Sequence, residues 1–202
     1  MLNEARDHAS IKPKMAWGGF RSLDRPVKRL IAVGFLFGLA RFSESFLILK
    51  AMDSGLSAQW SPLVLALFNL SFLALAYPAG HLSDRIAPRH VLLAGIALLV
   101  VADLWLARAT SLWAIGIGVV LWGAHMALTQ GIFSRMIADA ASEDKRATSF
   151  GAFFFASGIA ALLASLGAGL LWDRSGPAAT FTAAAALAAL AGAMLILLPK
   201  ER

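Results

Sequence analysis

The chain has 202 residues, of which 59% are hydrophobic and 15% charged, and its mean hydropathy is +0.72. Soluble globular domains carry about 25% charged residues, so this composition excludes an ordinary soluble protein and also a disordered one. The chain contains no cysteine, which excludes disulfide frameworks, thiolate catalysis and cysteine-ligated metal sites. The formal net charge is +6, but the basic residues lie between apolar runs, so nucleic acid is not an expected partner.

Six apolar runs, each about as long as a bilayer-crossing helix, follow one another along the chain. A hydrocarbon core about 30 Å thick takes roughly 20 helical residues. Lipid tolerates only helices and closed barrels, and these runs lack the alternation of barrel strands. The sequence therefore predicts an all-α membrane protein with six transmembrane helices, surrounded by the lipid bilayer. The predicted spans are 30–49, 62–80, 91–107, 112–134, 148–172 and 177–198.

The distribution of Lys and Arg predicts the orientation of the spans. Short connections make successive spans alternate in direction, and the odd-numbered loops hold only Lys50, Arg108 and Arg174. The other basic residues, apart from one inside a span, lie in the leading segment and the even-numbered loops, so both termini are expected in the cytoplasm. Residues 1–26 are predicted to be a basic cytoplasmic lead, or a linker remnant, ahead of a transmembrane domain at 27–202. No apolar run follows the first residue, so a cleaved signal peptide is not expected.

A motif follows the second predicted span, where residues 80–90 read GHLSDRIAPRH. This segment resembles the loop motif G-x-L-(A/S)-D-(R/K)-x-G-(R/K)-(R/K) of the major facilitator superfamily, which joins the second and third helices of each six-helix half. Gly80, Asp84, Arg85 and Arg89 match the motif, whereas Ala87 replaces its second glycine. From residue type alone, Gly80 is expected to allow close packing at the end of a span. Asp84 is expected to accept hydrogen bonds from a neighbouring helix start.

Further segments, 39–50, 121–131 and 146–151, resemble the carboxy-terminal half of these permeases. The resemblance covers roughly residues 27–198, which corresponds to half of a twelve-helix permease. It implies transport of a small solute by alternating access, together with a second six-helix half that is either a separate polypeptide or another copy in a homodimer. It also implies a gating loop. The candidate gating residues are Gly80, Asp84, Arg85, Arg89 and Arg146.

Charged residues inside the spans are functional candidates, because a lone charge at the bilayer centre costs about 2.5–3.5 kcal/mol. Arg41 and Glu44 are three residues apart, so they are predicted to share a helix face and to form an ion pair. Asp103 is expected at a depth similar to that of Arg41, which makes Arg41 a candidate to bridge Glu44 and Asp103. The alternative is that Asp103 snorkels to the outer surface, and the sequence assigns it no role.

The polar side chains of His125, Asn69 and Gln130 complete the candidate pathway. His125 lies within the fourth span, and a histidine, which titrates near neutral pH, suits proton-coupled transport. Glu44 is the second candidate proton carrier, and a purely structural hydrogen bond is the alternative for His125. Asn69 and Gln130 are candidates to line a cavity, with helix-to-helix hydrogen bonding as the alternative.

No enzyme motif is recognisable in the sequence. No histidine follows Ser157-Gly158, the four histidines are dispersed, and no phosphate-binding G-x-x-x-x-G-K-(S/T) segment is present, so neither a metal site nor a cofactor is expected. The predicted function is a proton-coupled secondary transporter of a small solute in a bacterial inner membrane. The alternative is a non-transporting accessory or scaffold protein, or a truncated remnant of a permease.

Overall fold

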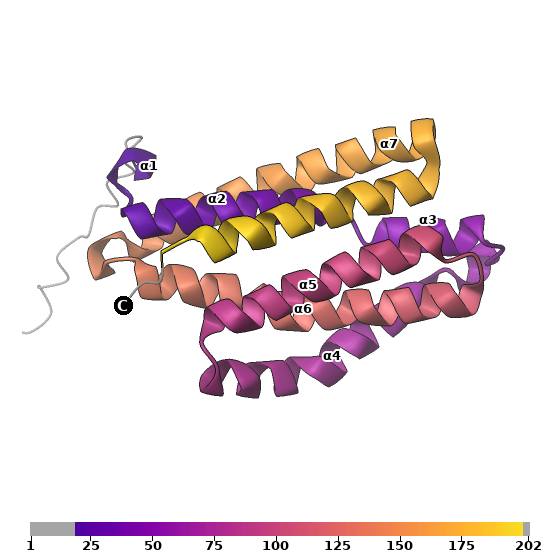
Figure 1. Ribbon diagram of the computed structural model, residues 1–202, viewed down its shortest axis with the longest axis horizontal. Coiled ribbons are helices and arrows are strands. Elements are labelled where there is room, and N and C mark those ends of the chain that lie inside the picture. Colours follow the sequence, from indigo (N-terminus) through magenta and orange to yellow (C-terminus); the bar gives the residue numbers. More distant parts are fainter. Residues whose placement is uncertain (1–18, 200–202) are drawn as a thin grey trace, which may run out of the picture.

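The computed structural model describes residues 19–199, and these are almost entirely helical, with no strand among them (Figure 1). Residues 1–18 of the predicted basic lead lie outside the described range. The helices are α1 (Gly19–Ser22), α2 (Arg25–Ala40), α3 (Ser45–Asp53), α4 (Pro62–Arg85), α5 (Pro88–Arg108), α6 (Leu112–Ala140) and α7 (Arg146–Leu197), with 3₁₀ turns at η1 (Ala58–Trp60) and η2 (Glu143–Lys145).

The starts of the long helices follow from local sequence. A proline stands in the first turn of α2, α4 and α5, where its missing N–H costs no hydrogen bond and its fixed φ suits a helix. Helix α6 begins after Ser111, whose hydroxyl oxygen accepts from the backbone N–H of Ala114 at 3.3 Å, as an N-cap serine does. Prolines and one capping serine therefore set where four of the long helices begin.

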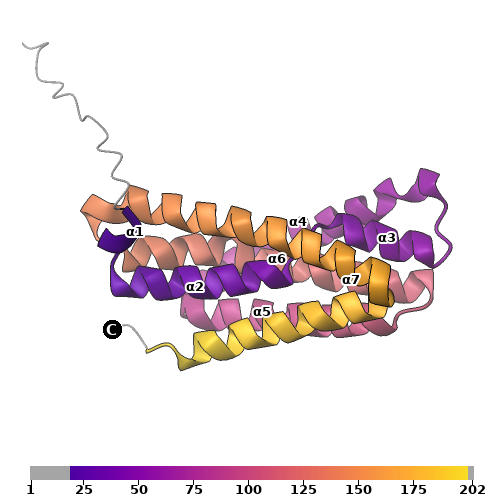
Figure 2. The same ribbon diagram turned by 90° about the horizontal axis from the view of Figure 1, so that it is seen from above.

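Five helical stretches are long and apolar enough to cross a membrane, which confirms the predicted class, an all-α membrane protein. The last stretch has 55 residues, far more than a bilayer crossing needs. Inside α7, Gly176 adopts φ +80°, and the chain reverses there, so that the segment after it runs back toward the end at which α7 begins (Figure 2). Helix α7 is thus a hairpin of two arms, 146–175 and 177–197. The five stretches are Arg25–Asp53, Ala58–Arg85, Pro88–Arg108, Leu112–Ala140 and Glu143–Leu197.

The first predicted span, 30–49, is wrong as a single helix. Helix α2 ends at Ala40, residues 41–44 are not helical, and α3 begins at Ser45. The break places Phe42 in the core, where the centroid of its ring lies 5.8 Å from the ring centroid of Trp122 and 5.4 Å from that of Phe181. Aromatic contacts at these distances stabilise the packing beyond area burial alone, which favours the interrupted helix over a straight one.

The motif that was predicted to lie in a loop is mostly helical. Helix α4 continues through Gly80, Asp84 and Arg85, and α5 begins at Pro88, so only two residues separate the helices. Hydropathy placed the end of the span at residue 80 because the following residues are polar. The helix extends further because a polar helical turn is stable outside the apolar layer.

Close helix contacts depend on small residues. A Cβ at Gly34 would lie 2.8 Å from the ring of Phe153, and one at Gly38 would lie 2.8 Å from Cβ of Ala160. Helix α2 packs on α7 at these positions, α5 lies between α6 and α7, and α4 packs on α6. The G-x-x-x-G segment in the first span is therefore a helix-packing feature, as is common in membranes.

Both ends of the bundle are visible in the ribbon views. The starts of α2, α5 and α7 and the ends of α4, α6 and α7 lie at one end, and the turn between the two arms of α7 lies at the other (Figures 1 and 2). Most basic residues of the described range belong to the helix starts and ends at the first end, whereas α3, the end of α5 and the turn of α7, which hold Lys50, Arg108 and Arg174, lie toward the second (Figure 1).

Candidate functional site

A groove on the bundle brings together three of the predicted pathway residues. Glu44 comes from the turn that precedes α3, Asn69 from α4 and Gln130 from α6. The groove has a volume of about 390 Å³, within the range of small-molecule sites, roughly 300–1,000 Å³. Its remaining walls are mostly apolar, with lining residues Ser45, Leu65, Phe68, Phe72 and Met126.

The polar groups of this groove are available to a ligand. Asn69 and Gln130 are exposed and Glu44 is half-buried. The Asn69 amide donates to the carbonyl of Leu65 one turn earlier at 2.7 Å, which orients the side chain and leaves its amide oxygen to accept. The groove therefore offers one carboxyl, two amides and the hydroxyl of Ser45 among apolar side chains, a donor and acceptor set suited to a small polar solute.

Arg41 lies behind this groove, at the end of α2. Its guanidinium Nη2 contacts the sulfur of Met126, which also lines the groove, and its Cζ lies 5.6 Å from the centroid of the Phe37 ring. Nε of Arg41 is buried without a hydrogen-bond partner among the described residues. A cation over an aromatic face is stabilised electrostatically, so Phe37 contributes to holding this charge inside the bundle.

The predicted pairing of Arg41 was wrong. Because residues 41–44 are not helical, Arg41 and Glu44 do not share a helix face. Within residues 19–199, no salt bridge joins Arg41 to Glu44 or to Asp103. The predicted bridge required a continuous first helix, and the break removes that geometry.

Asp103 is fully buried, so it does not snorkel to the surface. Its Oδ1 accepts from the indole Nε1 of Trp122 at 2.8 Å, and its Oδ2 has no partner in the described part of the chain. Trp122 also contacts His125 edge-on, with the ring centroids 4.9 Å apart. Trp122 was not among the predicted site residues, because nothing in the sequence indicates which group on another helix an indole N–H will reach.

His125 lies in the core of the bundle with no exposed surface. Neither ring nitrogen has a hydrogen-bond partner among the described residues, so the predicted structural hydrogen bond is not formed there. The backbone carbonyl of His125 accepts from Thr129 Oγ1 at 2.9 Å. His125 thus lies in the core beside Trp122 and is not one of the residues that line the groove.

The predicted gating residues occupy the basic end of the bundle. Asp84 Oδ1 pairs with Arg135 Nη1 at 3.2 Å, and the same nitrogen donates to the carbonyl of Ser83 at 3.0 Å. Asp84 therefore joins α4 to α6 through Arg135. The prediction that Asp84 accepts hydrogen bonds from a neighbouring helix start was wrong. Arg135 was not among the predicted gating residues. Its only signal in the sequence is its position directly after the fourth predicted span, and many basic residues share such a position.

The remaining gating candidates differ from one another. Arg89 Nη2 donates to the carbonyls of Leu195 and Ile196 at 2.8 and 2.7 Å, which satisfies carbonyls at the end of α7. Arg146 is the first residue of α7, and both it and Arg85 are exposed. The predicted close packing at Gly80 is wrong, because a Cβ there would meet nothing within 4 Å.

A second connection at this end joins the start of α2 to the turn before α7. Asp24 Oδ1 accepts from Lys145 Nζ at 2.9 Å, and Oδ2 accepts from the backbone and hydroxyl of Ser142 at 3.3 and 3.1 Å. The hydrogen bond from Lys145, and then those from Ser142, lower the pKa of Asp24 below its usual value of 3.8. No group of three His, Asp or Glu side chains in the described residues is placed to hold a metal ion.

Comparisons with known proteins agree with this architecture. The family model of the major facilitator superfamily matches residues 15–202. The chain belongs to the major facilitator superfamily. It is 32% identical over 184 residues to an uncharacterized MFS-type transporter of Methanocaldococcus jannaschii, a match that covers 88% of this chain and 46% of that protein.

A solved structure has the same fold. The human organic anion transporter MFSD10 superimposes with a TM-score of 0.71 at 22% identity, over 84% of this chain and 40% of that one. At this identity the likeness shows the fold alone. The chain spans slightly less than half the length of the relatives that it matches, which agrees with the resemblance to one six-helix half.

Proposed function

We propose that this chain is one six-helix half of a secondary transporter and carries part of the pathway of a small polar solute. In this proposal each arm of α7 crosses the membrane, so that the five helical stretches make six crossings. Residues 27–202 then form one transmembrane domain, both termini face the cytoplasm, and the membrane is a bacterial inner membrane. The concentration of bases at one end of the bundle supports this orientation through the positive-inside rule.

The groove that contains Glu44, Asn69 and Gln130 is the observation that carries the proposal. Glu44, Asn69 and Gln130, from three different elements, and the hydroxyl of Ser45 converge on a groove whose other lining residues are apolar. Polar groups are costly in lipid, so they face a bundle interior or a water-filled cavity. Secondary transporters place their substrate sites near the bilayer midplane between two repeats. A second six-helix half packed against this groove would close it into such a site.

A second six-helix half is part of the proposal. Helix α4 presents large apolar side chains to the outside, among them Leu70, Leu73 and Tyr77, which are 63%, 70% and 83% exposed. We infer that part of this surface contacts either a separate six-helix polypeptide or a second copy of the chain. Alternating access then consists of rocking between the two halves about the groove, and the Asp84–Arg135 connection is the candidate gate.

Cysteine accessibility tests whether the groove is a watery pathway. The chain has no cysteine, so single replacements report without background labelling. Asn69→Cys and Gln130→Cys in native membranes are expected to react with a charged, membrane-impermeant thiol reagent, because the reacting thiolate needs water. The matched control is Leu190→Cys, on the second arm of α7 and 56% exposed, which is expected to face lipid and to remain unlabelled. Protection of both groove cysteines would contradict a pathway and favour the accessory, scaffold or remnant alternative.

Proton coupling is proposed for Glu44 or His125. Glu44 is the ionisable side chain that lines the groove, and His125 is fully buried in the core. At least one of Glu44→Gln and His125→Gln is expected to abolish solute accumulation driven by a pH gradient in membrane vesicles, while facilitated exchange of the same solute remains. Unchanged accumulation in both variants would contradict the assignment.

A further inference from the structure

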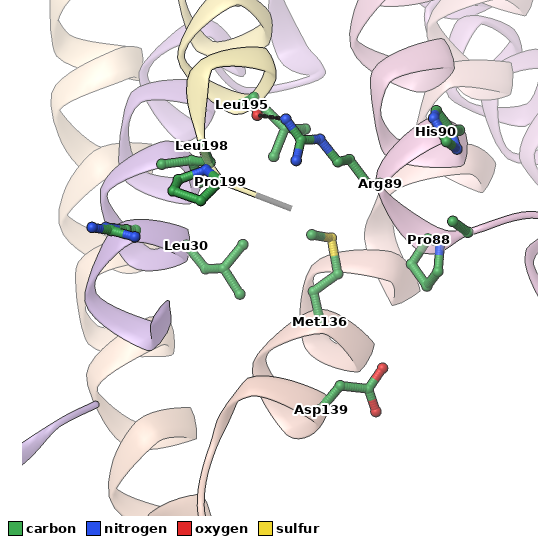
Figure 3. A pocket seen from close by; sticks show the side chains of 11 residues that line it. Leu30, Pro88, Arg89, His90, Met136, Asp139, Leu195, Leu198 and Pro199 are labelled. Atoms are coloured by element: carbon green, nitrogen blue, oxygen red, sulfur yellow. Dashed lines mark hydrogen bonds between the residues drawn. The ribbon is translucent and has the colours of Figure 1, made fainter. Parts of the chain in front are cut away.

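A second pocket lies at the basic end of the bundle, away from the groove. It is formed where α2, α6 and the start of α5 meet the end of α7, and its volume is about 340 Å³ (Figure 3). Arg89, which lines this pocket, is a predicted gating residue, but neither gating nor solute transport requires a cavity of this size. The position, at the membrane–cytoplasm boundary in the proposed orientation, places it at the depth of lipid headgroups.

The charges of the pocket favour an anion. Arg29, from α2, and Arg89 and His90, from the first turn of α5, line it together with one carboxylate, Asp139. The guanidinium of Arg89 is held by its Nη2 bonds to the carbonyls of Leu195 and Ile196, so its position is fixed before any ligand binds. Arg29, His90 and Asp139 are exposed. Two guanidiniums and one carboxylate leave a net positive lining, which suits a phosphate group.

The apolar part of the lining selects among phosphate compounds. Leu30, Met136, Leu195 and Leu198 line the pocket between the charged groups (Figure 3), and Ile196 and Leu197 extend an apolar surface outward, 61% and 83% exposed. A free phosphate ion gains nothing from such walls, whereas a phospholipid places its glycerol and acyl chains against them. Basic pockets between transmembrane helices at the cytoplasmic side are known to suit anionic headgroups.

We propose that this pocket binds the headgroup of an anionic phospholipid, with its phosphate between Arg29 and Arg89 and its acyl chains along the end of α7. Such a lipid joins α2, α5, α6 and the last turn of α7, four segments that meet only at this end of the molecule. The site rests on the membrane orientation given in the proposed function but not on solute transport, so failure of the lipid titration would leave the transport proposal untouched.

Lipid titration followed by native mass spectrometry tests the proposal. The purified chain in detergent is titrated with phosphatidylglycerol and, separately, with zwitterionic phosphatidylcholine, and at least one phosphatidylglycerol is expected to stay bound at concentrations at which phosphatidylcholine does not. Arg29→Gln is expected to weaken phosphatidylglycerol binding about five-fold, the equivalent of about 1 kcal/mol for one basic residue near an anionic headgroup. The matched control is Arg25→Gln, one helical turn away on α2, exposed and not part of the lining.

Two additional arms keep the test decisive. Arg89→Gln also removes the hydrogen bonds at the end of α7, so weaker lipid binding by this variant does not by itself identify the site. Asp139→Asn removes the carboxylate of the lining and is expected to tighten phosphatidylglycerol binding. An equal weakening by Arg25→Gln and Arg29→Gln would mean general surface charge and would overturn the site. Displacement of the lipid by inorganic phosphate at an equal concentration would mean a free-anion site and would overturn the lipid assignment.

Discussion

Two glycines on α6 provide a matched test of packing at the scale of single residues. A Cβ at Gly123 would lie 2.5 Å from the backbone oxygen of Phe68 and 2.8 Å from Cβ of Ser71, on α4, whereas one at Gly131 would meet nothing within 4 Å. Gly123→Ala is expected to force α4 away from α6 and to lower the free energy of unfolding by about 1–3 kcal/mol. Gly131→Ala is expected to be neutral or slightly stabilising, because alanine is the better helix former.

Thermal unfolding of the two variants in the same detergent checks this prediction. The hydrogen bond from Ser71 Oγ to the carbonyl of Val120, 2.7 Å long, joins the same two helices and is expected to be lost with Gly123→Ala. Equal unfolding midpoints for the two variants would contradict close packing of α4 on α6.

The Asp24 connection makes a prediction about pH. The pKa of Asp24 is lower in the folded chain than its usual value of 3.8, so the folded state favours the charged carboxylate. The resulting stabilisation is present above pH about 4 and is lost as the pH falls through the lowered pKa. The difference in unfolding midpoint between the native chain and Asp24→Asn is therefore expected to be largest near pH 7 and to shrink as the pH falls below about 4. A difference that stays constant from pH 7 to pH 3 would mean that Asn disturbs the turn by another route.

Residue type predicted some local roles and missed others. Gly34 and Gly38 lie where another helix packs closely against α2, whereas the close packing predicted at Gly80 is not formed. A glycine signals only that a close approach is permitted, and whether a neighbour uses it depends on which helix lies opposite. The Asp103–Trp122 hydrogen bond could not be predicted for the same reason, because it joins two helices whose relative rotation the sequence does not encode locally.

At the scale of elements, the interruption between α2 and α3 is the main departure from prediction. Hydropathy is nearly blind to it, since residues 41–44 are flanked by apolar runs on both sides. Its cause is tertiary, in the contacts of Phe42 and in the backbone N–H of Ser43, which donates to Ser165 Oγ at 3.3 Å. Polar Arg41 and Glu44 at the interruption were recognised from the sequence as functional candidates, but their ion pair was an artefact of assuming a straight helix.

The reversal of α7 depends on one glycine. Gly176 has φ +80° and ψ 177°, a region that is essentially restricted to glycine and costs other residues about 1–3 kcal/mol. Gly176→Ala is expected to lower the unfolding midpoint by the equivalent of that free energy. Gly169→Ala, seven residues earlier in the first arm and with open space at its Cβ, is the matched control and is expected to leave the midpoint unchanged. Two equal midpoints would show that the reversal tolerates a side chain.

At the scale of the whole molecule, the proposal of a second half predicts an assembly. The purified chain, 21.4 kDa, is expected to have the protein mass of two copies in a lipid nanodisc, or to co-purify from its native membrane with another six-helix polypeptide. Mass photometry and a pull-down measure the two cases. A stable monomer without a partner would contradict the transporter proposal and favour the accessory or remnant alternative.

The sequence was most informative about the fold class and least informative about how the residues of the candidate site are arranged in space. Length of the apolar runs and the placement of bases predicted an all-helical membrane protein with one basic end, because both depend on properties summed over many residues. The convergence of Glu44, Asn69 and Gln130 on one groove depends instead on how three elements rotate about their axes. Candidate residues could therefore be recognised one by one, while their arrangement required the structure.

The reversal at Gly176 also bears on how the last two segments enter the membrane. The charged residues next to it are Asp173 and Arg174, adjacent and opposite in sign, and both are exposed. A membrane potential does about 2.3 kcal/mol of work per elementary charge per 100 mV, so moving this tip across the bilayer transfers no net charge. In the proposed arrangement of six crossings, a membrane potential therefore neither assists nor opposes the transfer of this tip.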